Sequence, residues 1–161
     1  MINYNQAKSI LKKARIKIKD EYILVKNSLN RVTSKDIISP SNYPLGNNAA
    51  FDGFAINSKD TMNLNKKNYK YFKIIGTIAA GNKPIKKKIK KFESVEIMTG
   101  GIIPKSFNTI IPIEKIIFHP NNQNPKSIFI DHRISKYNNV RFKSSDYKKG
   151  QIIIKKGTLI Q

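Results

Sequence analysis

The sequence predicts a β-rich α+β fold, in which one amphipathic helix is followed mainly by short strands. Two observations carry this prediction. Apolar side chains recur at helical spacing only near the start of the chain, within residues 4–19. From residue 71 onward, apolar runs of strand length are separated by clusters of turn-forming residues. The 161 residues are enough for one compact domain or two small ones.

The helix is expected over residues 4–19. Its apolar side chains fall on one face of a helical wheel, at Tyr4, Ala7, Leu11, Ala14 and Ile18. Asn3 or Asn5 can cap its start. A basic amphipathic helix can bind a membrane surface or a partner. Packing on the rest of the domain is the commoner outcome, and we expect it here.

The segment after the helix is expected to be mostly extended. Residues 22–26 have the character of a short strand, and residues 34–39, with Ile37 and Ile38, return to an extended, β-branched character. Pro40 and Pro44 then interrupt regular structure. Residues 51–56, Phe-Asp-Gly-Phe-Ala-Ile, predict a tight turn that leads into a strand.

The second half of the chain predicts most of the strands. Residues 71–80 form the strongest strand pattern, in which Gly76 indicates a bulge or a close approach of another backbone. Residues 93–99 alternate apolar and polar side chains, which predicts a half-buried strand. Further strands are expected within residues 109–118, 128–130, 140–142 and 151–154.

The net charge of +21 raises the question of a nucleic-acid partner. The basic residues are 27 Lys and only 4 Arg, beside 28 Ile and 18 Asn. Lys, Ile and Asn all have A/T-rich codons, so a genome of low G+C content explains the excess without any selection for binding. A phosphate reader would also be expected to use more Arg. Nucleic-acid binding is therefore the weaker interpretation, although the charge attracts anions in general.

Other function classes leave no signature in the chain. No apolar run approaches the length of a membrane span, and the first residues lack the pattern of a secretory signal. There is no cysteine, which agrees with a cytoplasmic protein. His119 and His132 lack metal-ligand spacing, and no phosphate-binding glycine motif or nucleophile elbow is present.

Three polar loop positions could carry chemistry. Asp52 precedes Gly53, Thr99 precedes a Gly-Gly pair, and Asp146 follows two serines. A carboxylate can bind Mg²⁺ or accept a proton. A Thr-Gly-Gly turn can present a hydroxyl and free backbone N–H groups to an anion. On residue type alone, however, each of these is an ordinary turn or strand end, and that interpretation is favoured.

A family resemblance favours a functional role for these three positions. Several blocks in the same order resemble the molybdopterin molybdenumtransferases, the MoeA and gephyrin E-domain family: residues 30–40, 48–56, 75–81, 95–104 and 109–114, followed by Val140-Arg141 and Asp146. The resemblance covers nearly the whole chain from about Tyr4. Each block alone would be weak, but several in order are specific.

The resemblance implies a reaction and a set of site residues. Members of this family insert molybdate into adenylylated molybdopterin and release AMP with the help of Mg²⁺. By position in the motifs, Asp52, Thr99 and Asp146 are expected to be catalytic, and Asp52 is also the expected contact of the Mg²⁺. The substrate-binding positions implied are Asn48, Gly53, Gly100 and Arg141.

The family also implies an architecture. It is a homodimer with a mixed linker domain, here residues 1–45 and 138–161, and an inserted β-barrel-like domain, here residues 46–137. The α/β domain of the family is absent, so the chain is expected to be an N-terminal fragment that holds part of a site. The alternative is a non-catalytic dimerisation or scaffold module of the same family.

The chain departs from the family pattern at some of these positions. Asn47 stands where the family often has Asp, Ala49 where it has Ser, and Phe51 where it has Met. Ser144 and Ser145 replace a Gly-Glu pair. These changes bear on local polar contacts more than on Asp52 itself.

Overall fold

The computed structural model describes residues 2–14, 18–83, 85 and 87–161. The chain divides into two compact units, which are described separately. The terminal unit consists of Met1–Ile37 and Ile152–Gln161, and the β-rich unit is Ile38–Gln151. The family domains expected from the sequence, with boundaries at 45/46 and 137/138, stay a prediction. Within the described ranges, no helix has the length and apolar character needed to cross a membrane.

The terminal unit begins with the single α-helix found in the described residues, α1 (Tyr4–Lys13). Asn3 caps it: its side chain accepts the Gln6 N–H at 2.9 Å, and the Gln6 side chain accepts the Asn3 N–H at 3.0 Å. Ala14 is already extended, so the predicted range of 4–19 is too long. Residues 15–17 of that range lie outside the described residues.

The apolar face of α1 is exposed. Tyr4 is 76% and Leu11 74% exposed, and the described helix has no buried residue. The terminal unit by itself leaves this face uncovered, and its packing on the rest of the domain stays a prediction. An isolated helix of 10 residues is marginal in water, because tertiary packing normally supplies most of its stability. The early end of α1 agrees with that lack of support.

The rest of the terminal unit has little regular structure. The strand predicted at 22–26 is wrong, because those residues are coil followed by a short 3₁₀-helix, η1 (Val25–Asn27). Strand β1 (Ile37–Ile38) pairs with β10 (Ile152–Ile154). Beside them, Thr33 and Thr158 are joined by hydrogen bonds, with the Thr33 N–H donating to the Thr158 carbonyl at 3.0 Å.

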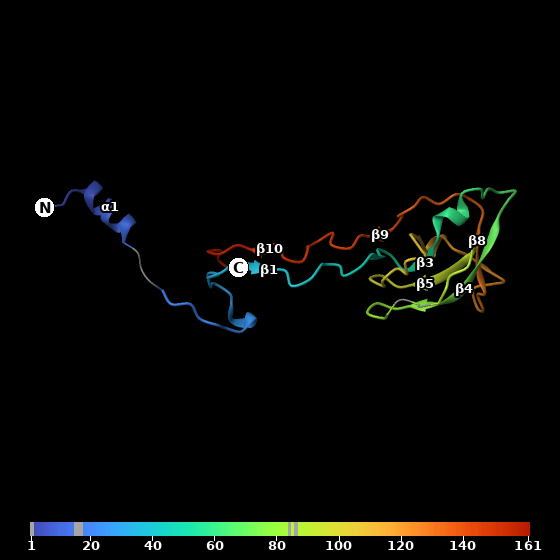
Figure 1. Ribbon diagram of the computed structural model, residues 1–161, viewed down its shortest axis with the longest axis horizontal. Coiled ribbons are helices and arrows are strands. Elements are labelled where there is room, and N and C mark those ends of the chain that lie inside the picture. Colours follow the sequence, from blue (N-terminus) through green and yellow to red (C-terminus); the bar gives the residue numbers. More distant parts are fainter. Residues whose placement is uncertain (1, 15–17, 84, 86) are drawn as a thin grey trace. The chain divides into compact units, whose positions relative to one another are not determined.

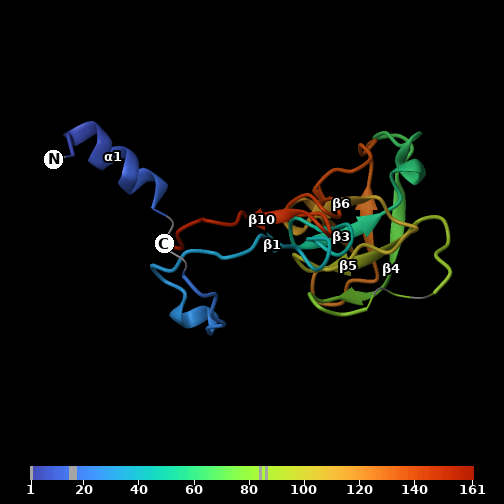
Figure 2. The same cartoon turned by 60° about the vertical axis from the view of Figure 1, so that its left-hand side comes forward.

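The β-rich unit is built on a six-stranded sheet in the order β6-β3-β5-β4-β8-β7 (Figures 1 and 2). Its strands are β3 (Gly53–Ile56), β4 (Lys70–Ile78), β5 (Glu93–Ile97), β6 (Thr109–Pro112), β7 (Ile117–His119) and β8 (Ser127–Ile130). Neighbours are antiparallel except β4 and β5, which are parallel. The sheet curls into half a barrel (Figure 2), so the mostly-β fold with one helix is confirmed.

Two hydrophobic clusters, one on each face of the sheet, form the core. Along β3, Ala55 belongs to one cluster while Phe54 and Ile56 belong to the other. This alternation follows from the two-residue period of a strand. Both faces of β5 are also covered, because Ser94 and Val95 are fully buried. Strand β5 is therefore more deeply buried than the half-buried strand that the sequence predicted.

Gly76 marks a bulge, as the sequence indicated. The register between β4 and β5 shifts between Ile74 and Thr77, and Gly76 has φ +154°. A glycine tolerates this backbone conformation, which other residues rarely adopt. A second, two-stranded sheet joins β2 (Asn48–Ala49) to β9 (Val140–Arg141).

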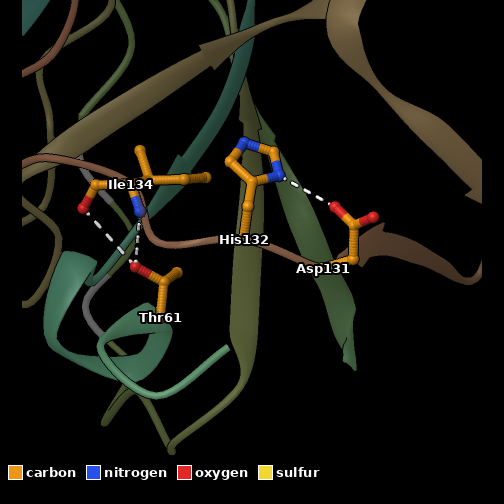
Figure 3. A network of polar contacts seen from close by, with 4 residues as sticks. All are labelled: Thr61, Asp131, His132 and Ile134. Atoms are coloured by element: carbon orange, nitrogen blue, oxygen red, sulfur yellow. Dashed lines mark hydrogen bonds and ion pairs between the residues drawn. The ribbon is translucent and has the colours of Figure 1, made fainter. Parts of the chain in front are cut away.

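A buried hydroxyl fixes the segment that runs from β8 to β9 (Figure 3). Thr61 is fully buried in the 3₁₀-helix η2 (Ser58–Thr61), where it donates to the Ser58 carbonyl at 2.8 Å and accepts the Ile134 N–H at 2.9 Å. Nearby, His132 Nδ1 lies 2.9 Å from Asp131 Oδ1, and this hydrogen bond lowers the pKa of the Asp131 carboxyl. His119 and His132 are both exposed.

Candidate functional site

Asp52 and Thr99 meet where two strands of the β-rich unit end. Strands β3 and β5 are antiparallel, with Gly53 opposite Ile97. The residue before β3 therefore lies close to the turn after β5. Asp52 Oδ1 accepts two hydrogen bonds from Thr99, one from the backbone N–H and one from the hydroxyl, both at 2.6 Å. The pairing joins residues 47 positions apart in the sequence.

These two bonds make the Asp52 carboxyl more acidic. The Thr99 hydroxyl, and after it the Thr99 backbone N–H, hold the pKa of the Asp52 carboxyl below its ordinary value. Asp52 is exposed, so solvent can reach it. The site thus presents an ionised carboxylate at neutral pH, oriented through one of its oxygens while the other faces no donor within the described part of the chain.

The Thr-Gly-Gly turn is held by its own backbone. Gly100 donates its N–H to the Ala49 carbonyl at 2.9 Å, and Gly101 donates to Met98 at 2.8 Å. Since the Thr99 N–H goes to Asp52, all three N–H groups are engaged within the chain. The expectation that they are free for an anion is wrong in this structure. Gly100 has φ +81°, a left-handed conformation that favours glycine.

Gly53 has a structural reason to be glycine. A Cβ built at this position would lie 2.0 Å from the carbonyl oxygen of Ile111 in the neighbouring strand β6. No side chain fits there without moving the backbone of β6. Gly53 is buried in β3, directly after Asp52, and so fixes where the carboxylate leaves the sheet. Its substrate-binding role stays a prediction.

Arg141 and Asp146 form a second polar group. The Arg141 guanidinium makes an ion pair with Asp146 Oδ2, and the Ser145 hydroxyl donates to Asp146 Oδ1 at 3.0 Å. The Asp146 N–H donates to the Tyr43 carbonyl at 3.0 Å. Both charged side chains are partly exposed. The loop after β9 therefore holds its acid in place by charge, hydroxyl and backbone contacts.

Strand β2 connects the two groups. Asn48 stands opposite Arg141 in the β2–β9 pair, while Ala49 exchanges backbone bonds with the Gly100-Gly101 turn. The structure thus brings the seven predicted site residues to one region of the β-rich unit. In the described residues, side-chain hydrogen bonds occur only within each group, and none joins Asp146 to Asp52 or Thr99.

Asn48 has an unpaired polar atom at the centre of this region. Its residue exposure is 9%, and its Oδ1 has no hydrogen-bond partner among the residues that the structure describes. Leaving a buried acceptor unpaired costs about 1–3 kcal/mol. Functional sites are one place where such a cost persists, because a bound molecule can satisfy the atom.

A magnesium ion would find only part of its ligand set here. No group of three His, Cys, Asp or Glu side chains that could hold a metal occurs within residues 2–14, 18–83, 85 and 87–161. Mg²⁺ is commonly bound by one or two carboxylates together with water and substrate phosphates. The free oxygen of Asp52 fits that pattern, provided that the substrate supplies the remaining ligands.

The departures from the family pattern have visible consequences. Asn47 Oδ1 accepts the Lys143 N–H at 2.9 Å, a bond that an aspartate could also make. Ala49 is 2% exposed and belongs to the hydrophobic core. Because it replaces the serine of the family pattern, this position has no hydroxyl. Phe51 is exposed beside Asp52. None of these changes touches the Asp52–Thr99 pair.

Sequence reasoning missed two contributors to this region. The Tyr43 backbone binds the 146–147 loop at both its N–H and its carbonyl. Pro44 beside it was interpreted only as an interruption of regular structure. The unpaired acceptor of Asn48 is the second, since no local pattern shows that a residue will be buried without a partner.

Comparisons with known proteins agree on one family. The family model described as the MoeA N-terminal region (domain I and II) matches residues 2–161. A curated protein of Staphylococcus aureus (strain Mu50), named molybdopterin molybdenumtransferase, is 30% identical over 138 residues, which is 86% of this chain and 32% of the relative. The protein of the same name from Bacillus subtilis is 29% identical over 87% of this chain and 32% of the relative.

Solved structures give the same result. A crystal structure titled molybdopterin biosynthesis MoeA protein from Pyrococcus horikoshii superposes with a TM-score of 0.83 at 26% identity. It is matched over 99% of this chain and 39% of its own. A second MoeA structure from this organism has a TM-score of 0.77 at 27% identity, over 88% of this chain and 36% of its own. The chain therefore spans about a third of the length of the proteins it matches, from 32% to 39%.

Proposed function

The chain belongs to the family of MoeA N-terminal regions, and on that premise we propose that it supplies part of a site that inserts molybdate into adenylylated molybdopterin with release of AMP. The observation that carries the proposal is the Asp52 carboxylate, which two bonds from Thr99 hold ionised. Its place in the family motif and its geometry support the same role. Molybdenum cofactor biosynthesis is the process to which the relatives' shared name refers.

In this proposal Asp52 holds Mg²⁺ and Thr99 positions Asp52. The bound metal would neutralise charge on the phosphate that joins AMP to the substrate. Thr99 occupies Oδ1, which leaves Oδ2 for the ion. The hydrogen bonds from Thr99 lower the pKa of Asp52 further below neutral pH, so the carboxylate stays available to a cation under mildly acidic conditions as well.

The remaining residues are proposed to hold the substrate. Arg141 offers a guanidinium for oxyanions, and Asp146 fixes its direction. Asn48 offers an unpaired buried acceptor for a substrate N–H or O–H. Gly53 is proposed to act by shape, since a side chain there would meet β6, and Gly100 through its left-handed backbone, φ +81°.

The chain cannot be proposed to complete this reaction by itself. It covers 32% of each curated relative described above, and the proposed site needs the nucleotide- and molybdate-binding α/β domain that the family resemblance implies. We propose a homodimer, in which that domain of one subunit faces the β-rich unit of the other, and a cytoplasmic location. These proposals concern a longer protein that contains these residues.

The second candidate is a dimerisation or scaffold module. The observation that favours it is the exposed apolar face of α1, with Tyr4 and Leu11 about three-quarters exposed. An exposed stripe of this kind suits association with another surface. The module would need neither Asp52 nor Mg²⁺.

One experiment separates the two candidates. The coding frame is followed past Gln161, and the protein it encodes is purified and mixed with adenylylated molybdopterin, Mg²⁺ and molybdate. The enzyme proposal predicts AMP release that depends on molybdate. Dimer formation without AMP release, from a frame that lacks an α/β domain, would instead support the scaffold module.

A further inference from the structure

Strands β4, β8 and β7 are neighbours in the six-stranded sheet, and they present aromatic side chains on one of its faces. The register places Tyr71, Phe129 and Ile117 in one row across the three strands, because opposite residues of an antiparallel pair share a face. Phe72 and Ile128 lie on the other face, where both are fully buried in the core. We call the first of these two faces the ring face, and its members are Tyr69, Tyr71, Lys73, Ile117, His119 and Phe129.

The rings of this face form one continuous cluster. The centroid of the Phe129 ring lies 5.0 Å from that of Tyr69 and 5.7 Å from that of Tyr71. Tyr71 also contacts His119, with ring centroids 4.4 Å apart. Although these contacts support the rings, Tyr69 and Tyr71 remain 45% and 44% exposed. The cluster is therefore an aromatic surface that is arranged before any partner binds.

The ring face makes little contribution to the core. Among the described residues, neither hydrophobic cluster includes Tyr71, Phe129 or Ile117. Ile117 is 62% exposed, so the apolar surface extends from the rings to the edge strand β7. A contiguous exposed apolar patch of this kind marks an interaction surface more often than scattered apolar side chains do.

The charge around the rings is positive. Lys73 lies on the ring face, two residues after Tyr71, and Lys70 and Lys126 are exposed on the same pair of strands or next to it. The described strands β4, β7 and β8 contain no Asp or Glu. In the part of the chain that the structure describes, no ion pair within 4.0 Å engages these three lysines. The acid nearest to them along the chain, Asp131, is hydrogen-bonded to the histidine that follows it. The surroundings therefore favour an anionic partner.

Strand register, and not composition, brings these groups together. A genome of low G+C content accounts for the number of lysines in the chain, but it does not gather rings from positions 69–71, 119 and 129 on one surface beside lysines. Rings and positive charges side by side fit a partner that carries both flat apolar groups and negative charges.

We propose that the ring face binds single-stranded nucleic acid. Unpaired bases pack on the rings of Tyr69, Tyr71 and Phe129, and the lysines contact the phosphates. Lysine suits this task, because a phosphate backbone that is bound without sequence preference needs charge and not directional base recognition. The inference goes beyond the proposed function and does not rest on it, since the ring face shares no residue with the candidate site.

Fluorescence anisotropy of the 161-residue chain with a labelled thymidine single strand of about 12 nucleotides tests the proposal. An abasic strand of the same length keeps the phosphates and lacks the bases. It should bind at least about tenfold more weakly than the thymidine strand. Equal affinity for the two strands would overturn the stacking on the rings, and no saturable binding of the thymidine strand at low salt would overturn the site.

Ring variants test the place of the bases. Tyr69→Leu with Tyr71→Leu should weaken binding of the thymidine strand by about tenfold and leave the affinity for the abasic strand unchanged, since the lysines remain. The matched control is Tyr4→Leu with Tyr22→Leu, two exposed tyrosines of the terminal unit, which should bind like the unaltered chain. Heat denaturation shows whether each variant is folded. An unchanged affinity in the folded ring variant, or an equal loss in the control, would contradict the proposal.

Lysine variants separate the ring face from general attraction to a basic protein. Lys70→Gln with Lys73→Gln should reduce the slope of log affinity against log salt concentration by about 0.7 for each lysine. The control Lys12→Gln with Lys13→Gln removes the same charge from exposed positions of the terminal unit and should change the slope less. An equal change in the control would mean that net charge alone attracts the strand, and the proposed site would then be wrong.

Discussion

Asp52 owes its chemical character to a single neighbour. Thr99 donates twice to one oxygen of the carboxylate, and these bonds both orient the group and keep it ionised. The carboxylate is exposed, so its lowered pKa comes from direct hydrogen bonds. At the scale of residues, the functional unit is the Asp52–Thr99 pair, because neither residue alone would define the site.

Removing the hydroxyl should raise the pKa of Asp52. Thr99→Val keeps the backbone N–H but loses the larger of the two stabilising bonds, so the carboxyl should titrate closer to an ordinary aspartate. NMR titration of the Asp52 carboxyl carbon measures this. The matched control is Thr77→Val, which removes a hydroxyl bonded to Glu96 on the same sheet. A rise in Thr77→Val as large as in Thr99→Val would contradict the assignment.

The sign of the pH effect follows from the same shift. The folded-state pKa of Asp52 lies below its unfolded value, so the stabilising contribution is complete above the unfolded pKa of about 4. It is lost as the pH falls through the lower, folded pKa. The unaltered protein should therefore lose more stability than Thr99→Val over this acidic range, as measured by urea denaturation at a series of pH values.

Gly53 should be among the positions least tolerant of a methyl group. In Gly53→Ala the added Cβ would lie 2.0 Å from the Ile111 oxygen, and relieving that overlap requires β3 and β6 to separate. We expect a loss of about 2–4 kcal/mol in the free energy of unfolding. Gly81→Ala is the control: it meets nothing within 4 Å and has φ +81°, so only a backbone cost of about 1 kcal/mol applies. Equal losses in the two variants would show that the overlap is relieved cheaply.

At the scale of elements, strands with strong local patterns were predictable and isolated ones were not. Residues 71–80 and 51–56 gave β4 and β3 because apolar side chains on both faces of the sheet enter a core. The strand predicted at 22–26 failed because β-propensity needs a partner strand, and none pairs with these residues in the described chain. Helix α1 began as predicted, at the Asn3 cap, but ended early.

The Ile134 end of the segment between β8 and β9 should depend on the Thr61 hydroxyl. Thr61→Val keeps the shape of the side chain but leaves the buried Ile134 N–H without its acceptor, which we expect to cost about 1–3 kcal/mol. Hydrogen exchange at the Ile134 amide should become faster. Thr61→Ser retains the hydroxyl and serves as the control, so its Ile134 amide should stay protected. Unchanged exchange in Thr61→Val would show that another group binds this N–H.

For the whole molecule, the sequence located the site residues only through the family resemblance. Physical reasoning placed Asp52, Thr99 and Asp146 in turns and favoured an ordinary structural role for each. Their proximity depends on strand register, above all on Gly53 facing Ile97, which a local pattern does not specify.

The most direct test of the account is the molybdate-dependent release of AMP by the full-length protein with Asp52→Asn. This change keeps the size of the side chain but removes its charge, and the account predicts a rate lower by about 10²–10⁴ with the oligomeric state unchanged. The control Asp20→Asn removes one exposed acid of the terminal unit and should retain the original rate. A normal rate in Asp52→Asn would contradict the central claim, because the ionised carboxylate would then have no part in the reaction.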